Sequence, residues 1–166
     1  MKRIPREIVD KTWRRIGSMS PSEAPALVHS MSEEQPAVLA YLLASGMDNF
    51  NEDEREILLY VGIVIWQIMR AGGCLEPVSE ETLEAVEARN LAMLQYLESE
   101  CDGGFDRAVQ LIFENYNQIE VLKYAIEAVL EHEPDEEPLV REENRGLMVY
   151  FLKNVIDCLD EQSPSS

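Results

Sequence analysis

Apolar residues return every three or four positions through most of this chain, and acidic or other polar residues fill the positions between them. This spacing is typical of amphipathic helices that bury one face. Capping patterns that begin at Ser20, Ser32, Asn51 and Ser79 mark helix starts, because short polar side chains satisfy the free N–H groups of a first turn. We predict eight helices, near residues 5–16, 21–31, 33–45, 52–71, 80–100, 105–116, 118–132 and 139–160.

The segment 57–69 is the exception to the amphipathic pattern, since it is apolar almost throughout. Its isoleucine and valine content would also suit a buried strand. A capping pattern from Asn51 to Glu54 precedes it, and the chain has no second segment that could pair with it as a strand. We therefore predict a buried central helix.

Two motifs occur twice, in the same order. The pattern Ser-x-x-Gln-x-x-Val-Leu-x-Tyr over 32–41 returns over 115–124, with asparagine in the first position and an offset of 83 residues. An acidic helix start that ends in tyrosine, over 52–60, returns over 142–150 at an offset of 90. The second offset is seven residues longer than the first, and the extra residues fall in the acidic stretch 131–138, which we interpret as an inserted loop.

These motifs predict a single compact all-α domain over residues 1–160, made of two related four-helix units at about 1–73 and 79–160. We expect a helical bundle or a short helical array of about eight helices, and the sequence leaves those two arrangements open. Chance similarity between two pairs of amphipathic helices is the alternative explanation. Residues 161–166 are predicted to form a disordered tail.

The charge of the chain narrows the classes of partner. The net charge is −18, yet residues 1–20 carry six basic groups and two acidic ones, which leaves −22 on the rest. A body this acidic repels phosphate backbones, so we expect no direct binding to nucleic acid. Because the chain is acidic, we expect a basic protein partner. The hydrophobic content of 46% is typical of folded proteins.

Cysteine and hydrophobic patterns bear on compartment and cofactors. The three cysteines form no Cys-x-x-Cys pair and the chain has two histidines, which argues against a disulfide framework and a zinc site. The longest apolar run covers 57–66, half of the roughly 20 residues that span a bilayer. We expect a cytoplasmic protein without a transmembrane segment and without a cofactor.

No set of residues forms a catalytic signature, and candidate binding residues come from the repeat. Four repeated tyrosines and two repeated arginines are candidates for the lining of a groove between the two units, although aromatics at helical spacing more often belong to a core. These candidates are Tyr41, Tyr60, Tyr124, Tyr150, Arg55 and Arg145. The repeated Gln35 and Gln118 are expected to complete capping boxes with Ser32 and Asn115.

The first predicted helix is basic and amphipathic. Its apolar stripe includes Trp13, and its polar positions carry Arg14 and Arg15. Such a helix can bind a partner groove or an acidic membrane. The favoured interpretation is internal: the stripe packs on the core and the arginines lie against the acidic body.

These features favour a non-enzymatic interaction protein, an adaptor or regulatory subunit with an acidic binding surface. One alternative is a small-molecule sensor or enzyme with a pocket between the repeats. Another is an acidic mimic of nucleic acid that binds a basic protein. A homodimer is compatible with each of them.

Overall fold

The computed structural model describes residues 1–100 and 104–163, and within them the chain folds into α-helices without any strand. The predicted all-α class is confirmed, and each predicted helix lies within three residues of an observed one. The helices are α1 (Arg6–Gly17), α2 (Ala24–Glu34), α3 (Pro36–Ala44), α4 (Glu52–Gly72), α5 (Glu80–Glu100), α6 (Gly104–Asn115), α7 (Ile119–Leu130) and α8 (Glu142–Glu161).

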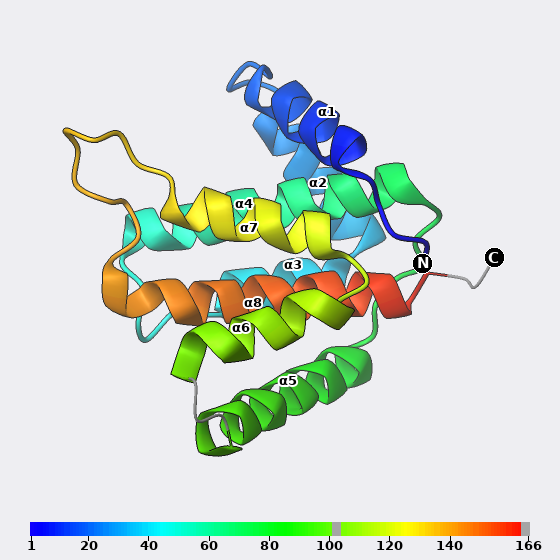
Figure 1. The fold of residues 1–166 in the computed structure, drawn as a ribbon. Helices are drawn as coiled ribbons and strands as arrows, with labels where there is room; N and C mark the ends of the chain where they lie inside the picture. The colour runs from blue at the N-terminus through cyan, green and yellow to red at the C-terminus, as the bar shows by residue number, and fades with distance from the viewer. Residues whose placement is uncertain (101–103, 164–166) are drawn as a thin grey trace.

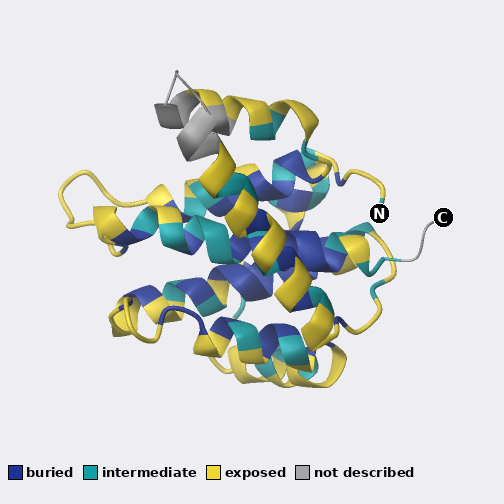
Figure 2. Ribbon diagram, turned by 90° about the horizontal axis from the view of Figure 1, so that it is seen from below, coloured by how far each residue is buried: buried dark blue, intermediate teal, exposed yellow. Residues whose placement is uncertain are grey.

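Helices α4 and α8 lie side by side in the middle of the molecule and run in the same direction (Figure 1). Helices α1, α2 and α3 pack on α4, while α5 packs on α8 and α7 contacts both central helices. The segment 57–69 lies inside α4, as a helix, and most of its side chains are buried. Figure 2 shows the buried residues gathered along this central pair.

The core explains why these two helices are central. Trp66 and Met69 of α4 and Met148 and Ile156 of α8 are fully buried, with at most 1% of each side chain exposed. Burial of a side chain of this size stabilises the fold by roughly 1.5–3 kcal/mol. Helices with buried residues on nearly every face have to lie inside the molecule, and the flanking helices cover them with their apolar faces.

The start of α4 is fixed by the predicted capping box. The Asn51 side chain accepts a hydrogen bond from the Glu54 N–H at 2.9 Å, and the Glu54 carboxylate accepts one from the Asn51 N–H at 3.1 Å. Glu54 is fully buried and also accepts from Asn144 Nδ2 at 2.9 Å and from Arg141 Nε at 2.9 Å. The buried carboxylate therefore joins the N-terminal ends of α4 and α8.

Three other helices, α2, α3 and α8, each begin three residues later than predicted, and α8 begins at Glu142. Ser32 lies inside α2, where its hydroxyl donates to the His29 carbonyl at 2.6 Å, and the helix continues to Glu34. The next helix begins at Pro36, because proline needs no N–H partner in a first turn. Helix α2 begins at Ala24. A serine near a helix end is compatible with several positions, and the proline decides this boundary.

The C-terminal segment is held more firmly than predicted. Glu161 ends α8, Gln162 donates to Thr82 Oγ1 at 2.9 Å, and Ser163 donates to the Cys74 carbonyl at 3.0 Å. These three residues are therefore part of the fold, and residues 164–166 of the predicted tail lie outside the described residues. Among the helices that the structure describes, none is both long and apolar enough to cross a membrane.

Candidate functional site

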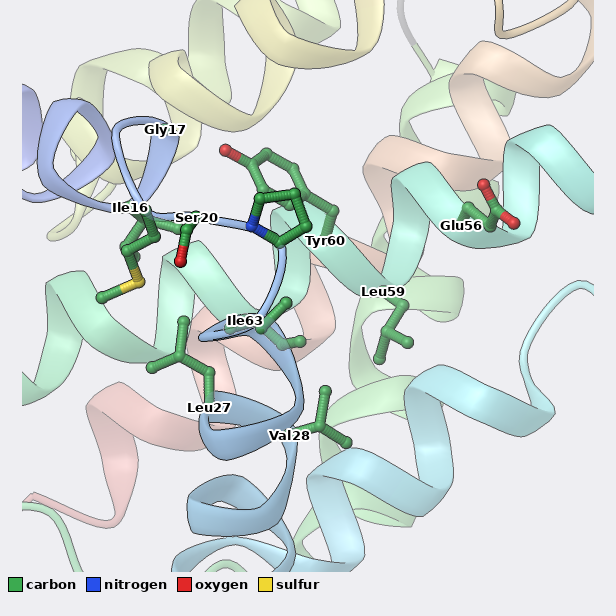
Figure 3. A pocket seen from close by; sticks show the side chains of 12 residues that line it. Ile16, Gly17, Ser20, Leu27, Val28, Glu56, Leu59, Tyr60 and Ile63 are labelled. Atoms are coloured by element: carbon green, nitrogen blue, oxygen red, sulfur yellow. The ribbon is translucent and has the colours of Figure 1, made fainter.

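A groove of about 370 Å³ opens between α4 and the turn that joins α1 to α2 (Figure 3). Figure 3 shows Leu27 and Val28 of α2 pointing toward Leu59 and Ile63 of α4. The lining is mainly apolar and consists of Ile16, Gly17, Met19, Ser20, Pro21, Ala24, Leu27, Val28, Glu56, Leu59, Tyr60 and Ile63.

A second, shallower hollow of about 220 Å³ continues the groove along α4. It is lined by Asp53, Glu56, Ile57, Tyr60 and Leu139, and therefore shares two residues with the first. From Asp53 to Ile63 the lining positions of α4 lie on one side of the helix, over about 15 Å of its length. We call this combined surface the α4 groove.

The rim of the α4 groove is acidic. Asp53 and Glu56 are exposed, and neither forms an ion pair with a cation in the described part of the chain. Partial burial raises the pKa of the Tyr60 hydroxyl, and the negative charge of the nearby Glu131 raises it further. The Tyr60 side chain is 48% exposed and stays protonated at neutral pH. The surface thus combines an apolar floor, the phenol of Tyr60, and carboxylates that form no ion pair within the described residues.

The four repeated tyrosines form two pairs. Tyr41 and Tyr150 both pack on Phe151, with ring centroids 6.1 and 5.7 Å away from its ring. The Tyr41 hydroxyl accepts from Asn154 Nδ2 at 3.0 Å, and the Tyr150 hydroxyl donates to the Glu87 carbonyl at 3.0 Å. These two tyrosines are therefore committed to internal contacts.

Tyr124 and Tyr60 form the other pair, on α7 and α4. Tyr124 is 8% exposed, and burial raises its pKa, with smaller contributions from Tyr60 and Glu131. Of the predicted site residues only Tyr60 lines the α4 groove. Arg55 is exposed on a different side of α4, and Arg145 donates to the Val140 carbonyl at 3.4 Å.

The repeated glutamines have a role that the sequence did not predict. Gln35 Oε1 accepts from the Val78 N–H at 2.9 Å while its Nε2 donates to the Glu76 carbonyl at 2.9 Å. Both glutamines lie between two helices, and neither forms a side-chain cap. The expected capping boxes are therefore wrong: Gln35 holds the extended segment before α5.

Gln118 makes the same bidentate contact with the segment before α1. Its Oε1 accepts from the Ile4 N–H at 3.0 Å, and its Nε2 donates to the Lys2 carbonyl at 3.0 Å. A further bond reaches Asp160 Oδ1 at 2.8 Å. The sequence showed that both glutamines recur, but their partners are 41 to 116 residues away along the chain. No local pattern could identify them.

A polar cluster lies buried between α5 and α8. Asn90 Nδ2 donates to Asn154 Oδ1 at 2.7 Å and to Asp157 Oδ2 at 2.9 Å. Lys153 Nζ lies 2.7 Å from Asp157 Oδ2, and the Tyr116 hydroxyl donates to Asp157 Oδ1 at 2.5 Å. Burial and the Asp157 charge raise the pKa of Tyr116 well above its ordinary value. These groups satisfy one another, which fits a role in joining α5 to α8.

Helix α1 packs on α4 and α7 and buries Val9 and Ile16, whereas Trp13 of its predicted apolar stripe is exposed. Trp13 is 36% exposed and donates to Asp10 Oδ1 at 3.1 Å, while Arg14 lies over its ring at 5.4 Å. Arg15 donates to Gln67 Oε1 of α4 at 3.2 Å. Arg6 bonds to Glu127 of α7 at 3.0 Å. Helix α1 therefore neutralises part of the acidic body.

Within the part of the chain that the structure describes, cysteine and metal chemistry indicate no second site. Cys158 is fully buried, and burial raises the pKa of its thiol to about 12. Cys74 is exposed, and Cys101 lies outside the described residues. No group of histidine, cysteine and carboxylate side chains in the described ranges is arranged to hold a metal ion.

Comparison with known proteins does not indicate a family. No protein-family model matches the chain, and neither a curated protein nor a solved structure shows significant similarity to it. Function must therefore be inferred from the α4 groove and its surroundings.

Proposed function

We propose that this chain is a non-enzymatic protein-interaction module, an adaptor or regulatory subunit, and that its α4 groove binds a partner with basic residues. The observation that carries the proposal is the combination of an apolar groove of about 370 Å³ with a rim of carboxylates that lack a cation in the described residues. Apolar pockets that receive an anchor side chain dominate the energy of many interfaces.

Charge supports the same proposal. A net charge of −18 attracts basic proteins over a distance of about 10 Å at ordinary ionic strength and raises the rate of encounter. The carboxylates at the rim then favour one partner over another, because an acidic competitor would be repelled. The apolar floor supplies affinity, and the acidic rim supplies specificity and speed.

The same groove is poorly suited to catalysis. The polar side chains of the α4 groove are Ser20, Asp53, Glu56 and Tyr60, and Glu56 stands toward one end of the larger hollow in Figure 3. A catalytic site needs an acid, a base or a nucleophile within hydrogen-bond reach of one another. Its volume lies within the range of small-molecule sites, so a small-molecule sensor is the second candidate. That site would be the larger hollow, whose lining residues all lie within 16–63, and not a pocket between the two units.

We also infer that residues 1–73 and 79–160 are two copies of one helical plan. Gln35, in the first unit, holds the segment before the second unit's first helix, and Gln118 holds the segment before α1. The two contacts cross between the units in opposite directions, which is expected for two copies related by an approximate two-fold axis.

Two further observations support the repeat. Glu54 and Asn144, which correspond at the offset of 90 residues, bond to each other where α4 and α8 begin. Tyr41 lies with Tyr150, and Tyr124 lies near Tyr60, so each pair takes one tyrosine from each copy. Unlike topologies of residues 32–71 and 115–160 would exclude this inference.

The docking proposal is tested by affinity capture with the full chain. Wild type, Tyr60→Ala and the matched control Tyr96→Ala, an exposed tyrosine on α5, are immobilised and incubated with lysate at low and moderate salt. We expect at least one protein that the wild type and Tyr96→Ala capture, that Tyr60→Ala loses, and whose capture weakens as salt rises. Identical captured sets for all three proteins would contradict the proposal. Stabilisation by a small molecule in a thermal-shift screen would favour the second candidate.

A further inference from the structure

Resting on the proposed docking function, we propose that the occupant of the α4 groove is one face of a basic amphipathic helix, with an apolar anchor beside Tyr60 and a lysine or arginine near Glu56. The groove follows α4 for about 15 Å, which matches roughly three turns of a bound helix. Anchors at positions i, i+3 or i+4, and i+7 of a helix fill a groove of that length.

The backbone of the molecule argues against an extended peptide. An extended peptide binds by adding a strand to the free edge of a sheet, and the described residues contain no strand. A proline-rich peptide needs a groove lined by several aromatic rings, whereas Tyr60 is the one aromatic residue among those that line the α4 groove. A bound helix forms its backbone hydrogen bonds internally, so the groove has to supply only an apolar surface.

The molecule already packs a helix of this type against α4. Helix α1 is basic and amphipathic, it buries Val9 and Ile16, and it contacts α4 and α7. Its Arg6 binds Glu127 and its Arg15 binds Gln67. The α4 groove begins where α1 ends, at Ile16 and Gly17. Beyond that point α2 and the turn before it form one wall of the groove, and the exposed carboxylates Asp53 and Glu56 of α4 pair with no described cation.

Tyr60 is the residue that distinguishes this surface from its counterpart. In the second unit the corresponding Tyr150 donates its hydroxyl to the Glu87 carbonyl of α5. Tyr60 has no such bond within the described residues and is 48% exposed. A half-exposed tyrosine with an uncommitted hydroxyl at the edge of an apolar hollow is a typical hot-spot residue. We assign Tyr60 as the anchor contact of the partner helix.

Fluorescence anisotropy with labelled model peptides tests the chemistry of the occupant. The first probe is a peptide of about 14 residues in which leucine repeats at helical spacing and lysine fills the remaining positions. A second has the same composition with strict alternation of the two residues, and a third has glutamate in place of lysine. We expect the first peptide to bind the wild type at least about tenfold more tightly than either of the others.

Variants then locate the binding. Tyr60→Ala should raise the Kd of the first peptide about tenfold or more, while Tyr96→Ala leaves it unchanged. Glu56→Gln should raise the Kd about threefold at low salt and have no effect at about 1 M salt. The matched control is Glu84→Gln, because Glu84 is an exposed glutamate of α5. Circular dichroism spectra and thermal unfolding confirm that each variant is folded.

Two outcomes would overturn the inference. One is equal binding of the alternating or the acidic peptide, which would show that helical shape or positive charge is not recognised. The other is equal binding of the first peptide to wild type and Tyr60→Ala, which would show attraction to the acidic surface as a whole. If Tyr60→Ala still loses a captured protein in the lysate experiment, the docking function stands and only the assignment of a basic helix fails.

Discussion

Truncation of Gln35 to alanine should destabilise the protein by about 2–4 kcal/mol. The side chain is 1% exposed, and it satisfies the N–H of Val78, a residue that is itself 3% exposed. A buried N–H left without a partner costs about 1–3 kcal/mol. The cavity that remains adds about 1 kcal/mol. The Glu76 carbonyl contributes little to the loss, because Glu76 is exposed and water can replace the amide.

The same reasoning applies to Gln118→Ala. The Ile4 N–H loses its acceptor, and Ile4 is 1% exposed. Urea unfolding followed by circular dichroism measures both free energies of unfolding. The control is Gln95→Ala, because Gln95 is an exposed helical glutamine of α5. We expect that control to change stability by less than about 0.5 kcal/mol.

Amide hydrogen exchange gives a local readout of the same contacts. The Val78 amide should lose protection in Gln35→Ala and keep it in Gln118→Ala, while the Ile4 amide should do the reverse. If both variants unfold within about 0.5 kcal/mol of Gln95→Ala, or if neither amide exchanges faster, the bidentate contacts do not hold these segments. Packing of Ile4 and Val78 on the core would then be the main restraint.

Three further predictions follow from other contacts. Burial alone would raise the pKa of Glu54, but hydrogen bonds from Asn144, Asn51 and Arg141 lower it overall. The stability that wild type gains over Glu54→Gln should therefore be present above pH 4.5 and disappear as the pH falls below that value, measured by urea unfolding across pH. An equal difference at every pH would contradict this. Gly146→Ala should stabilise α8 by about 0.5–1 kcal/mol in thermal unfolding, because an added Cβ meets no atom within 4 Å. Gly62→Ala should destabilise by about 1–3 kcal/mol, since its Cβ would lie 2.5 Å from Leu42 Cδ1, and the same sign for both variants would refute the packing argument. A thiol reagent should modify Cys74 in the folded protein and leave Cys158 unmodified until urea unfolds the chain, as mass spectrometry can show.

The sequence predicted the helices well because their signals are local. Apolar spacing depends on residues three or four apart, and the capping box from Asn51 to Glu54 lies within four consecutive residues. The stop after α3 is equally local: Gly46 has a φ of 75°, a conformation that favours glycine, and a Cβ there would meet the Phe50 ring at 2.3 Å. Errors arose where one residue type suits several positions, as Ser32 did near the end of α2.

The candidate site could not be predicted in the same way. Tyr60 was a candidate because it recurs, but the sequence could not distinguish it from the other three repeated tyrosines. Tertiary structure decided that Tyr150 donates to Glu87 while Tyr60 remains half exposed beside the turn of residues 18–23. Helical periodicity identifies which face of a helix is apolar, but it does not say which part of that face a neighbour covers.

The sequence by itself therefore determined the helices, the charge and the existence of recurring residues, because each depends on neighbours along the chain or on composition. The folded chain decided what the recurring residues do. Gln35 and Gln118 make long-range contacts within the chain and do not cap helices. Hydrogen bonds between residues 41 to 116 positions apart form only when packing brings the segments together. The α4 groove exists for the same physical reason: α1 ends before it can cover the whole of α4.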